Sequence, residues 1–456
     1  MAGIGFELRK LLRKDSFFGM LQAYGYAGII SSGPWILSIL GVMAVGLLSL
    51  SLKTQAVDVI SFLVSITYLT AFSLISGGWL QLMLTRFIAD RLFAEEADQI
   101  LPNLIGALLV TTAGSFLIGM LFWPLFEGTS LTYRYLMVST LIVLSDIWVL
   151  VIMMSGLRSY HKVLYAFALG YGSTIILSLI LRHLGTEGLL AGFLFGQSIM
   201  MFWMLGLIVH EFPATTLCSF SFLDKNKVFY SLTAISVTYN LGVWADKFVF
   251  WFNPITSVTV IGPLRSSLIY DPPIFLAYLS IIPGMAVFLL RMEADFVDKC
   301  EAFYSAIREG KTLSSIRNLK YEMIETIRSS FFEIFKIQSI TIIILLVSAH
   351  DVLQLFNIST NFQMLFSVDL VAVGIQVVLL SIFNVLFYLD KRLTVLFLAL
   401  MFAVTNFLFT WLSLFFEPEF YGFGFASAIF VTVIVGFVLL NKVLAQLEYE
   451  TFMLQK

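Results

Sequence analysis

One segment of the chain combines charged, amide and aromatic side chains in a pattern suited to a polar ligand with flat faces. Spacings of four, three and four place an amide, two indoles and a cation on one helix face, with a phenol and a carboxylate on the neighbouring face: Asn240, Trp244, Lys247 and Trp251, then Tyr239 and Asp246. Sugars present C–H faces to aromatic rings and hydroxyls to amides and carboxylates. The pattern predicts the wall of a wet cavity. The alternative is that Lys247 reaches the outer membrane interface and Asp246 pairs with a neighbouring helix.

Two further carboxylates and one basic cluster are candidates for other roles. Asp146 and Asp369 each fall within a long apolar stretch, where an ionisable side chain is costly and is a functional candidate. Either could carry a coupling proton, and either could instead hydrogen-bond a neighbouring helix. Arg86, Asp90 and Arg91 lie where a span is expected to meet the cytoplasm. They could gate the cytoplasmic mouth of a cavity, although basic residues are expected there from topology alone.

Recognisable catalytic and metal-binding patterns are missing. The chain has no DxD sequence, and Gly310-Lys311-Thr312 lacks the upstream glycine of a phosphate-binding loop, because Ser305 stands at that position. Cys218 and Cys300 form no CxxC pair. The four histidines are isolated from one another and from the cysteines. We therefore expect no enzyme, no metal and no cofactor, and the sequence indicates movement of a molecule instead of its covalent change.

Composition sets the environment of these residues. Of 456 residues, 59% are apolar and 12% charged, against about 45–50% and about 25% in soluble domains. The net charge of -2 does not favour nucleic acid. A bilayer core needs roughly 20 apolar residues of helix. That length predicts an all-α polytopic membrane protein with about twelve spans: 20–50, 58–84, 103–125, 135–156, 163–181, 188–209, 228–251, 272–290, 330–349, 364–389, 393–416 and 422–441.

Loop charge predicts the orientation of these spans. With the N-terminus in the cytoplasm, most of the 27 Lys and Arg residues fall on the cytoplasmic side, and only Lys53, Arg134, Arg182 and Arg265 fall outside. Both termini are then cytoplasmic. The expected organisation begins with an amphipathic segment at 1–19, whose helix is at 4–15. A six-helix bundle at 20–209, a cytoplasmic linker at 210–227 and a second six-helix bundle at 228–456 follow. The second bundle includes a charged cytoplasmic loop at 291–328, which is expected to be helical and either docks a partner or is solvated.

Three stretches carry a resemblance to a known family. MAGIGFELRKLL, AYGYAGIISSGPWILS and NLGVWADKFVFWF resemble the inner-membrane exporters of the Pel exopolysaccharide system, and the resemblance covers the whole chain. It implies the fold of the multidrug/oligosaccharidyl-lipid/polysaccharide flippases, with a central cavity between two bundles. It also implies export of an N-acetylhexosamine-rich biofilm polysaccharide across the bacterial inner membrane. The implied partners are a cytoplasmic glycosyltransferase that uses UDP-sugars and inner-membrane scaffold proteins, one of which senses cyclic di-GMP.

Other functions stay open on the residues alone. A flippase of lipid-linked oligosaccharides would be expected to carry several cavity arginines for a diphosphate, whereas the cations within the predicted spans are Lys247 and Lys336. A scaffold that holds a synthase at the membrane would explain the loop at 291–328 and the basic segment, but not the charges within the membrane. A cation-coupled drug antiporter is a fourth possibility.

Overall fold

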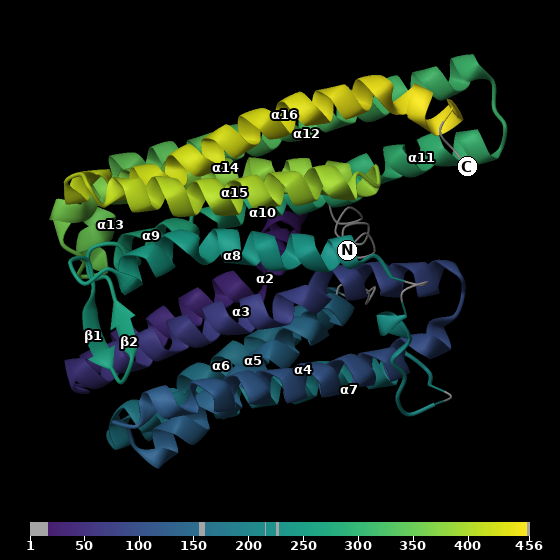
Figure 1. Cartoon of the computed structure of the whole chain (residues 1–456). Helices are drawn as coiled ribbons and strands as arrows, with labels where there is room; N and C mark the ends of the chain where they lie inside the picture. The colour runs from purple at the N-terminus through teal and green to yellow at the C-terminus, as the bar shows by residue number, and fades with distance from the viewer. Residues whose placement is uncertain (1–16, 155–159, 215, 225–227, 454–456) are drawn as a thin grey trace. The chain divides into compact units, whose positions relative to one another are not determined.

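The computed structural model describes residues 17–154, 160–214, 216–224 and 228–453. They divide into two compact units (Figure 1), an N-terminal unit of Gly33–Asp271 and a C-terminal unit of Met1–Ser32 with Pro272–Lys456. The two units divide between Asp271 and Pro272, which lies beyond the predicted linker 210–227. The part of this linker as a boundary between the two bundles stays a prediction. The predicted amphipathic helix at 4–15 lies outside the described residues.

The N-terminal unit contains seven of the long helices in the described part of the chain and a small antiparallel sheet. Helix α2 begins in the C-terminal unit and ends in this one. The elements are α2 Phe17–Ser51, α3 Ala56–Phe93, η1 Ala97–Gln99, α4 Ile100–Phe122, η2 Trp123–Phe126, α5 Leu131–Met154, α6 Tyr160–Leu181, η3 Arg182–Leu184, α7 Gly185–Glu211, η4 Ser221–Leu223, α8 Tyr230–Phe252, β1 Val258–Ile261 and β2 Leu264–Ser266. The two strands form a hairpin with an irregularity between Thr259 and Ile261, and no strand was predicted there.

The C-terminal unit is helical throughout its described residues. Figure 1 shows α12, α14, α15 and α16 running alongside one another for much of their length. The elements are α9 Asp271–Tyr278, α10 Ile281–Leu290, a π-helical segment Arg291–Phe296, α11 Val297–Arg308, α12 Leu313–Val347, α13 Ala349–Leu355, η6 Thr360–Phe362, α14 Gln363–Tyr388, α15 Arg392–Ser413, η7 Pro418–Phe420 and α16 Tyr421–Met453.

The predicted membrane spans are present in the described residues. Nine helical stretches of the described residues are long and apolar enough to cross a bilayer. The number is ten if the two parts of α2, Gln22–Ser31 and Ile36–Ser51, together form one span. One stretch, His161–Glu211, holds both α6 and α7, which turn back on each other at Gly185. Helix α8 fits none of these stretches but is 23 residues long, enough for a bilayer core. When α2 is counted as one span, α6 and α7 are counted separately and α8 is added, the total is the twelve spans predicted from the sequence.

Glycines determine how closely α6 and α7 pack. A Cβ atom at Gly192 would lie 2.3 Å from the Ser178 Cα, and one at Gly196 would lie 2.3 Å from the Thr174 Cα. The backbones therefore touch without side chains between them, as small residues allow in membrane helices. Polar side chains strengthen this contact, since Gln197 Nε2 donates to Thr174 Oγ1 at 3.1 Å.

The predicted loop 291–328 is helical, as expected. Helix α10 continues through the π-helical segment into α11, and the chain reverses at Gly310, which has a φ of +66°, before α12 begins. The Thr312 hydroxyl caps α12 by accepting from the Ser315 N–H. A contact distant in sequence joins α12 to the π-helical segment, because Glu333 Oε2 accepts from Arg291 Nε at 2.6 Å.

Candidate functional site

Two adjacent charges near the C-terminal end of α8 form a buried ion pair. Asp246 and Lys247 are 0% and 1% exposed, and Lys247 Nζ lies 2.9 Å from Asp246 Oδ2. Lys247 Nζ also donates to the Val243 carbonyl at 3.0 Å, and the Tyr270 hydroxyl donates to Asp246 Oδ2 at 2.6 Å. Each charge is therefore held by several partners, which is the condition for burying an ion pair. The Lys247 side chain is therefore enclosed within the unit.

A second buried carboxylate, Asp271, lies beside this pair. Both carboxylate oxygens accept from Trp251 Nε1 at 2.9 Å, and Oδ2 also accepts from the Ser266 hydroxyl and the Ser267 N–H. Ser266 ends strand β2, so Asp271 fastens the hairpin to α8. The predicted sites omitted Asp271 and Tyr270. The sequence feature that could have pointed to Tyr270 and Asp271 is an Asp-Pro-Pro helix start directly after a tyrosine.

The predicted ligand face of α8 packs partly against α3. Asn240 Nδ2 donates to the Leu74 carbonyl at 2.9 Å, where Gly78 leaves room, because a Cβ at Gly78 would lie 2.5 Å from that nitrogen. The Tyr68 ring stacks on Trp251 with centroids 4.3 Å apart. Asn240 and Trp251, which lie at opposite ends of the predicted ligand face, therefore both pack against α3.

The remaining two members of the predicted α8 set differ in burial. Trp244 is buried, and its ring centroid lies 6.0 Å from that of Trp251. Tyr239 is half-buried, as is Asn240. The structure thus brings Trp244, Asp246, Lys247 and Trp251 into one buried cluster and leaves Tyr239 and Asn240 partly open. Cavity lining by these residues stays a prediction.

The two candidate coupling carboxylates lie in different units. Asp146 on α5 accepts from the Thr112 hydroxyl of α4 at 2.8 Å, while its buried Oδ1 has no hydrogen-bond partner among the described residues. Asp369 on α14 is 0% exposed and packs against α16, where a Cβ at Gly422 would lie 2.9 Å from its Oδ1. Both carboxylates therefore contact neighbouring helices.

We expect Asp146→Asn to change the unfolding free energy by no more than about 1 kcal/mol and to retain export, because the amide oxygen can still accept from Thr112. Thr112→Val should cost about 1–3 kcal/mol, since it leaves the buried carboxylate without this donor. Unfolding of the purified variants in detergent and export measured in cells check both expectations. Lost export with unchanged stability in Asp146→Asn would instead assign Asp146 to coupling.

The candidate gate residues form local contacts at the C-terminal end of α3. Arg86 Nε lies 3.0 Å from Asp90 Oδ1 in an exposed i,i+4 pair, and Arg91 pairs with Glu96. The Arg86 guanidinium also lies 5.9 Å from the centroid of the Phe229 ring. Exposed pairs of this kind contribute about 0–1 kcal/mol. Their role as a gate stays a prediction.

The chemistry available at α8 is that of a fixed network of donors and acceptors. Carboxylates, an ammonium, a phenol and an indole can hold a polar ligand or exchange hydrogen-bond partners when helices move. Among the described residues, no three His, Cys, Asp or Glu side chains are grouped so that they could hold a metal ion. The arrangement around α8 therefore favours binding a polar ligand or positioning helices.

Comparison of the fold places this architecture among known transporters. An outward-facing multidrug resistance MATE family transporter of the MOP superfamily aligns with a TM-score of 0.67 and 13% identity, over 93% of this chain and 96% of that one. A MATE structure in the bent conformation gives 0.65 and 14%, over 96% and 98%. A MOP superfamily transporter from Pyrococcus furiosus gives 0.64 and 14%, over 93% and 96%. The protein is thus a multi-pass membrane protein with a MATE-like transporter fold of twelve spans in two lobes.

The family follows from the sequence profile of PelG, described as a putative exopolysaccharide exporter (EPS-E), which matches residues 1–452. The chain therefore belongs to the PelG family. No curated protein matches it. The predicted resemblance and the predicted all-α transporter fold are both confirmed.

Proposed function

We propose that this protein moves an N-acetylhexosamine-rich, Pel-type exopolysaccharide from the cytoplasm to the periplasm across the bacterial inner membrane. The observation that carries the proposal is the exporter-family match over residues 1–452 on a transporter fold. The polymer is made by a cytoplasmic glycosyltransferase and delivered to this protein as it grows. No covalent step is assigned to this chain.

Helix α8 supplies the groups best suited to a sugar chain. Tyr239 and Asn240 are half-buried, so they can offer a ring and an amide to the polymer. Trp244, Asp246, Lys247 and Trp251 are buried and hold α8 and the hairpin in position around them. Asp369 is the carboxylate that we propose for coupling to an ion gradient, and Asp146 takes this role only if Asp146→Asn loses export at unchanged stability. Arg86, Asp90 and Arg91 are the residues that we propose for the cytoplasmic gate.

The buried pair favours a glycan over a lipid-linked diphosphate. A diphosphate needs cations whose charge is not already balanced, whereas the Lys247 ammonium lies 2.9 Å from the Asp246 carboxylate. This observation ranks the lipid-linked oligosaccharide flippase below the polysaccharide exporter. A pure scaffold would have no need of such a pair within the membrane.

The α11–α12 hairpin is the surface we assign to partners, namely the glycosyltransferase and the inner-membrane scaffold proteins, one of which senses cyclic di-GMP. Its flank carries exposed charge, with Lys299 and Glu322 joined by a 2.7 Å ion pair. Lys320, in contrast, is largely buried and pairs with Glu448 of α16 at 3.3 Å, so it serves the fold. Exposed Lys311 and Arg328 are therefore the better contacts for a partner.

Polymer protection in inverted membrane vesicles tests the function. Vesicles with and without this protein receive the cytoplasmic synthase and UDP-N-acetylhexosamine, and glycosidase is then added outside. We expect glycosidase-resistant polymer in the lumen only with the protein present, and less of it with Tyr239→Ala and Asn240→Ala at equal protein level. Ile343→Ala, on a 59% exposed side chain of α12, is the control. Polymer made at the same rate but fully digestible would contradict export and favour the scaffold.

A further inference from the structure

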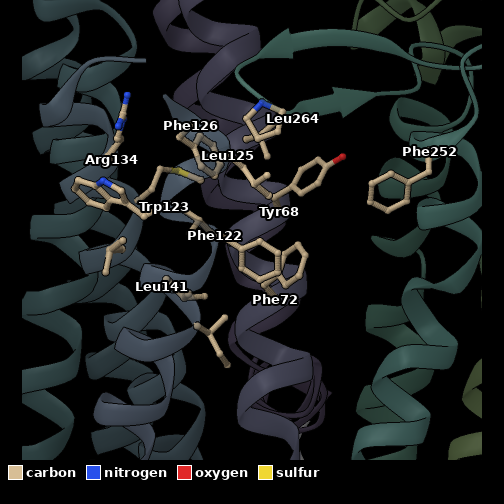
Figure 2. Close-up of a pocket in the computed structure, with 16 residues that line it drawn as sticks. Tyr68, Phe72, Phe122, Trp123, Leu125, Phe126, Arg134, Leu141, Phe252 and Leu264 are labelled. Carbon is tan, nitrogen blue, oxygen red and sulfur yellow. The ribbon is translucent and has the colours of Figure 1, made fainter. Parts of the chain in front are cut away.

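The N-terminal unit contains a cavity that the transport proposal does not use. It has a volume of about 190 Å³ and lies between α3, α4, η2 and α5, below the turn of the β1–β2 hairpin (Figure 2). Its walls are largely apolar, with the rings of Tyr68, Phe72, Phe122, Trp123 and Phe126 around one space and Leu264 above them. Every lining residue belongs to the N-terminal unit.

The lining suits hydrocarbon and not sugar. Few of its sixteen residues have polar side-chain groups, and the Tyr68 hydroxyl is already used, because it donates to the Arg265 carbonyl at 2.9 Å. A sugar in this cavity would lose the hydrogen bonds that its hydroxyls make in water. A protein cavity of about 150 Å³ lined by apolar side chains stays dry and binds a ring the size of benzene. This cavity therefore has room for a short stretch of alkyl chain.

One charged group lies at the edge of the cavity. Arg134 Nη2 donates to the Thr129 carbonyl at 3.1 Å, and its guanidinium lies 5.9 Å from the Trp123 ring centroid. Its Nε atom is buried and has no hydrogen-bond partner among the described residues. Arg134 thus keeps its charge and a spare donor beside an apolar space, and this combination matches a molecule with an apolar chain and an anionic end.

The helices around the cavity are built to face lipid. Leu117 and Leu121 of α4 are 67% and 75% exposed, and Leu125, which lines the cavity, is 60% exposed. Apolar side chains so exposed are expected where hydrocarbon replaces water as solvent. Arg134 follows the short loop between η2 and α5, where a membrane helix meets the headgroup layer.

We infer that this cavity holds an acyl chain of an anionic phospholipid, whose phosphate binds Arg134. The lipid belongs to the leaflet at the hairpin end of the unit, which the loop charges predict to be the outer one. Tyr68 forms one wall of the cavity and stacks on Trp251, the donor to Asp271. The acyl chain therefore packs against Tyr68, whose ring in turn supports Trp251 and so the contact of α8 with the hairpin. This inference does not depend on what the protein exports.

Photo-crosslinking from the acyl chain tests the site. The full-length protein is placed in vesicles with a phospholipid that carries a diazirine near the end of one chain, either with a phosphatidylglycerol or with a phosphatidylcholine headgroup. Mass spectrometry then maps the labelled peptides. We expect labelling within 118–141, and about fivefold more from the anionic lipid, the preference that one arginine near a membrane surface provides.

Two variants with matched controls separate the cavity from the general lipid surface. Leu141→Trp fills the cavity and should abolish this labelling, whereas Leu117→Trp, on an exposed α4 residue outside it, should not. Arg134→Gln should remove the preference for the anionic lipid, whereas Arg182→Gln should keep it, although Arg182 also donates to a backbone carbonyl. Labelling that survives Leu141→Trp in a folded protein, or equal labelling by both lipids in the unaltered protein, would overturn the inference.

Discussion

Asp246→Ala is expected to lower the unfolding free energy by about 3–5 kcal/mol, because it leaves the Lys247 ammonium buried without its carboxylate. Export should fall with it, since Tyr270 also loses the acceptor that ties it to α8. Lys247→Ala should cost a similar amount, because the buried Asp246 carboxylate then loses its counter-charge. The measurement is unfolding of purified variants in mixed micelles with increasing SDS, beside export at matched protein level.

A double-variant cycle distinguishes loss of the pair from general damage to the core. The double variant Asp246→Ala/Lys247→Ala removes both members of the pair, and the neighbouring Asp271 keeps its donors Trp251, Ser266 and Ser267, so we expect it to be more stable than either single variant. Lys162→Ala is the surface control, because its 2.7 Å pair with Glu211 is 40% exposed on both sides and should contribute about 0–1 kcal/mol. Costs of the two single changes that simply added in the double variant would show that Asp246 and Lys247 do not stabilise each other.

Gly192→Ala is the second change with a large expected effect. The new Cβ would lie 2.3 Å from both the Cα and the N of Ser178, and these backbone atoms can move only if α6 and α7 separate. We expect a loss of about 3 kcal/mol or more, the upper end of the usual cost of overpacking, and a lower melting temperature of the purified protein in detergent.

A matched glycine on the same helix serves as the control. A Cβ at Gly206 meets nothing within 4 Å, so Gly206→Ala should be neutral or stabilise the helix by up to about 1 kcal/mol. Equal melting temperatures for Gly192→Ala and Gly206→Ala would contradict the close backbone contact between α6 and α7.

The fold was largely predictable because membrane spans are encoded by length and apolarity. Helices also extend past the apolar stretches that predicted the spans. Helix α3 continues to Phe93, past the predicted end of its span at 84, and α12 begins at Leu313, within the segment 291–328 that was predicted to be helical. A hydropathy scan does not register such charged extensions, although charged residues are compatible with a solvated helix. The β1–β2 hairpin was missed because its strands have four and three residues.

The candidate site was predictable only in part. The rarity of charge within spans drew attention to Asp246 and Lys247, which are both buried; their part in a cavity stays a prediction. The hydrogen bond from Tyr270 to Asp246 depends on how the chain folds back after the hairpin. The spacing of residues along one helix contains no information on such a contact. The same is true of the pair between Glu333 and Arg291, which are 42 residues apart in sequence.

The glycine contact between α6 and α7 has a mechanical consequence. Two helices that touch through their backbones have no side-chain rotamers to exchange, so the pair is stiff and can move only as one piece. Helices α3 and α8 instead meet through Tyr68, Trp251 and Asn240, whose rings and amide can tilt or change partners. When the protein changes conformation, we therefore expect the N-terminal unit to deform mainly between α3 and α8, beside the buried charges. Helices α6 and α7 should move together as a rigid pair.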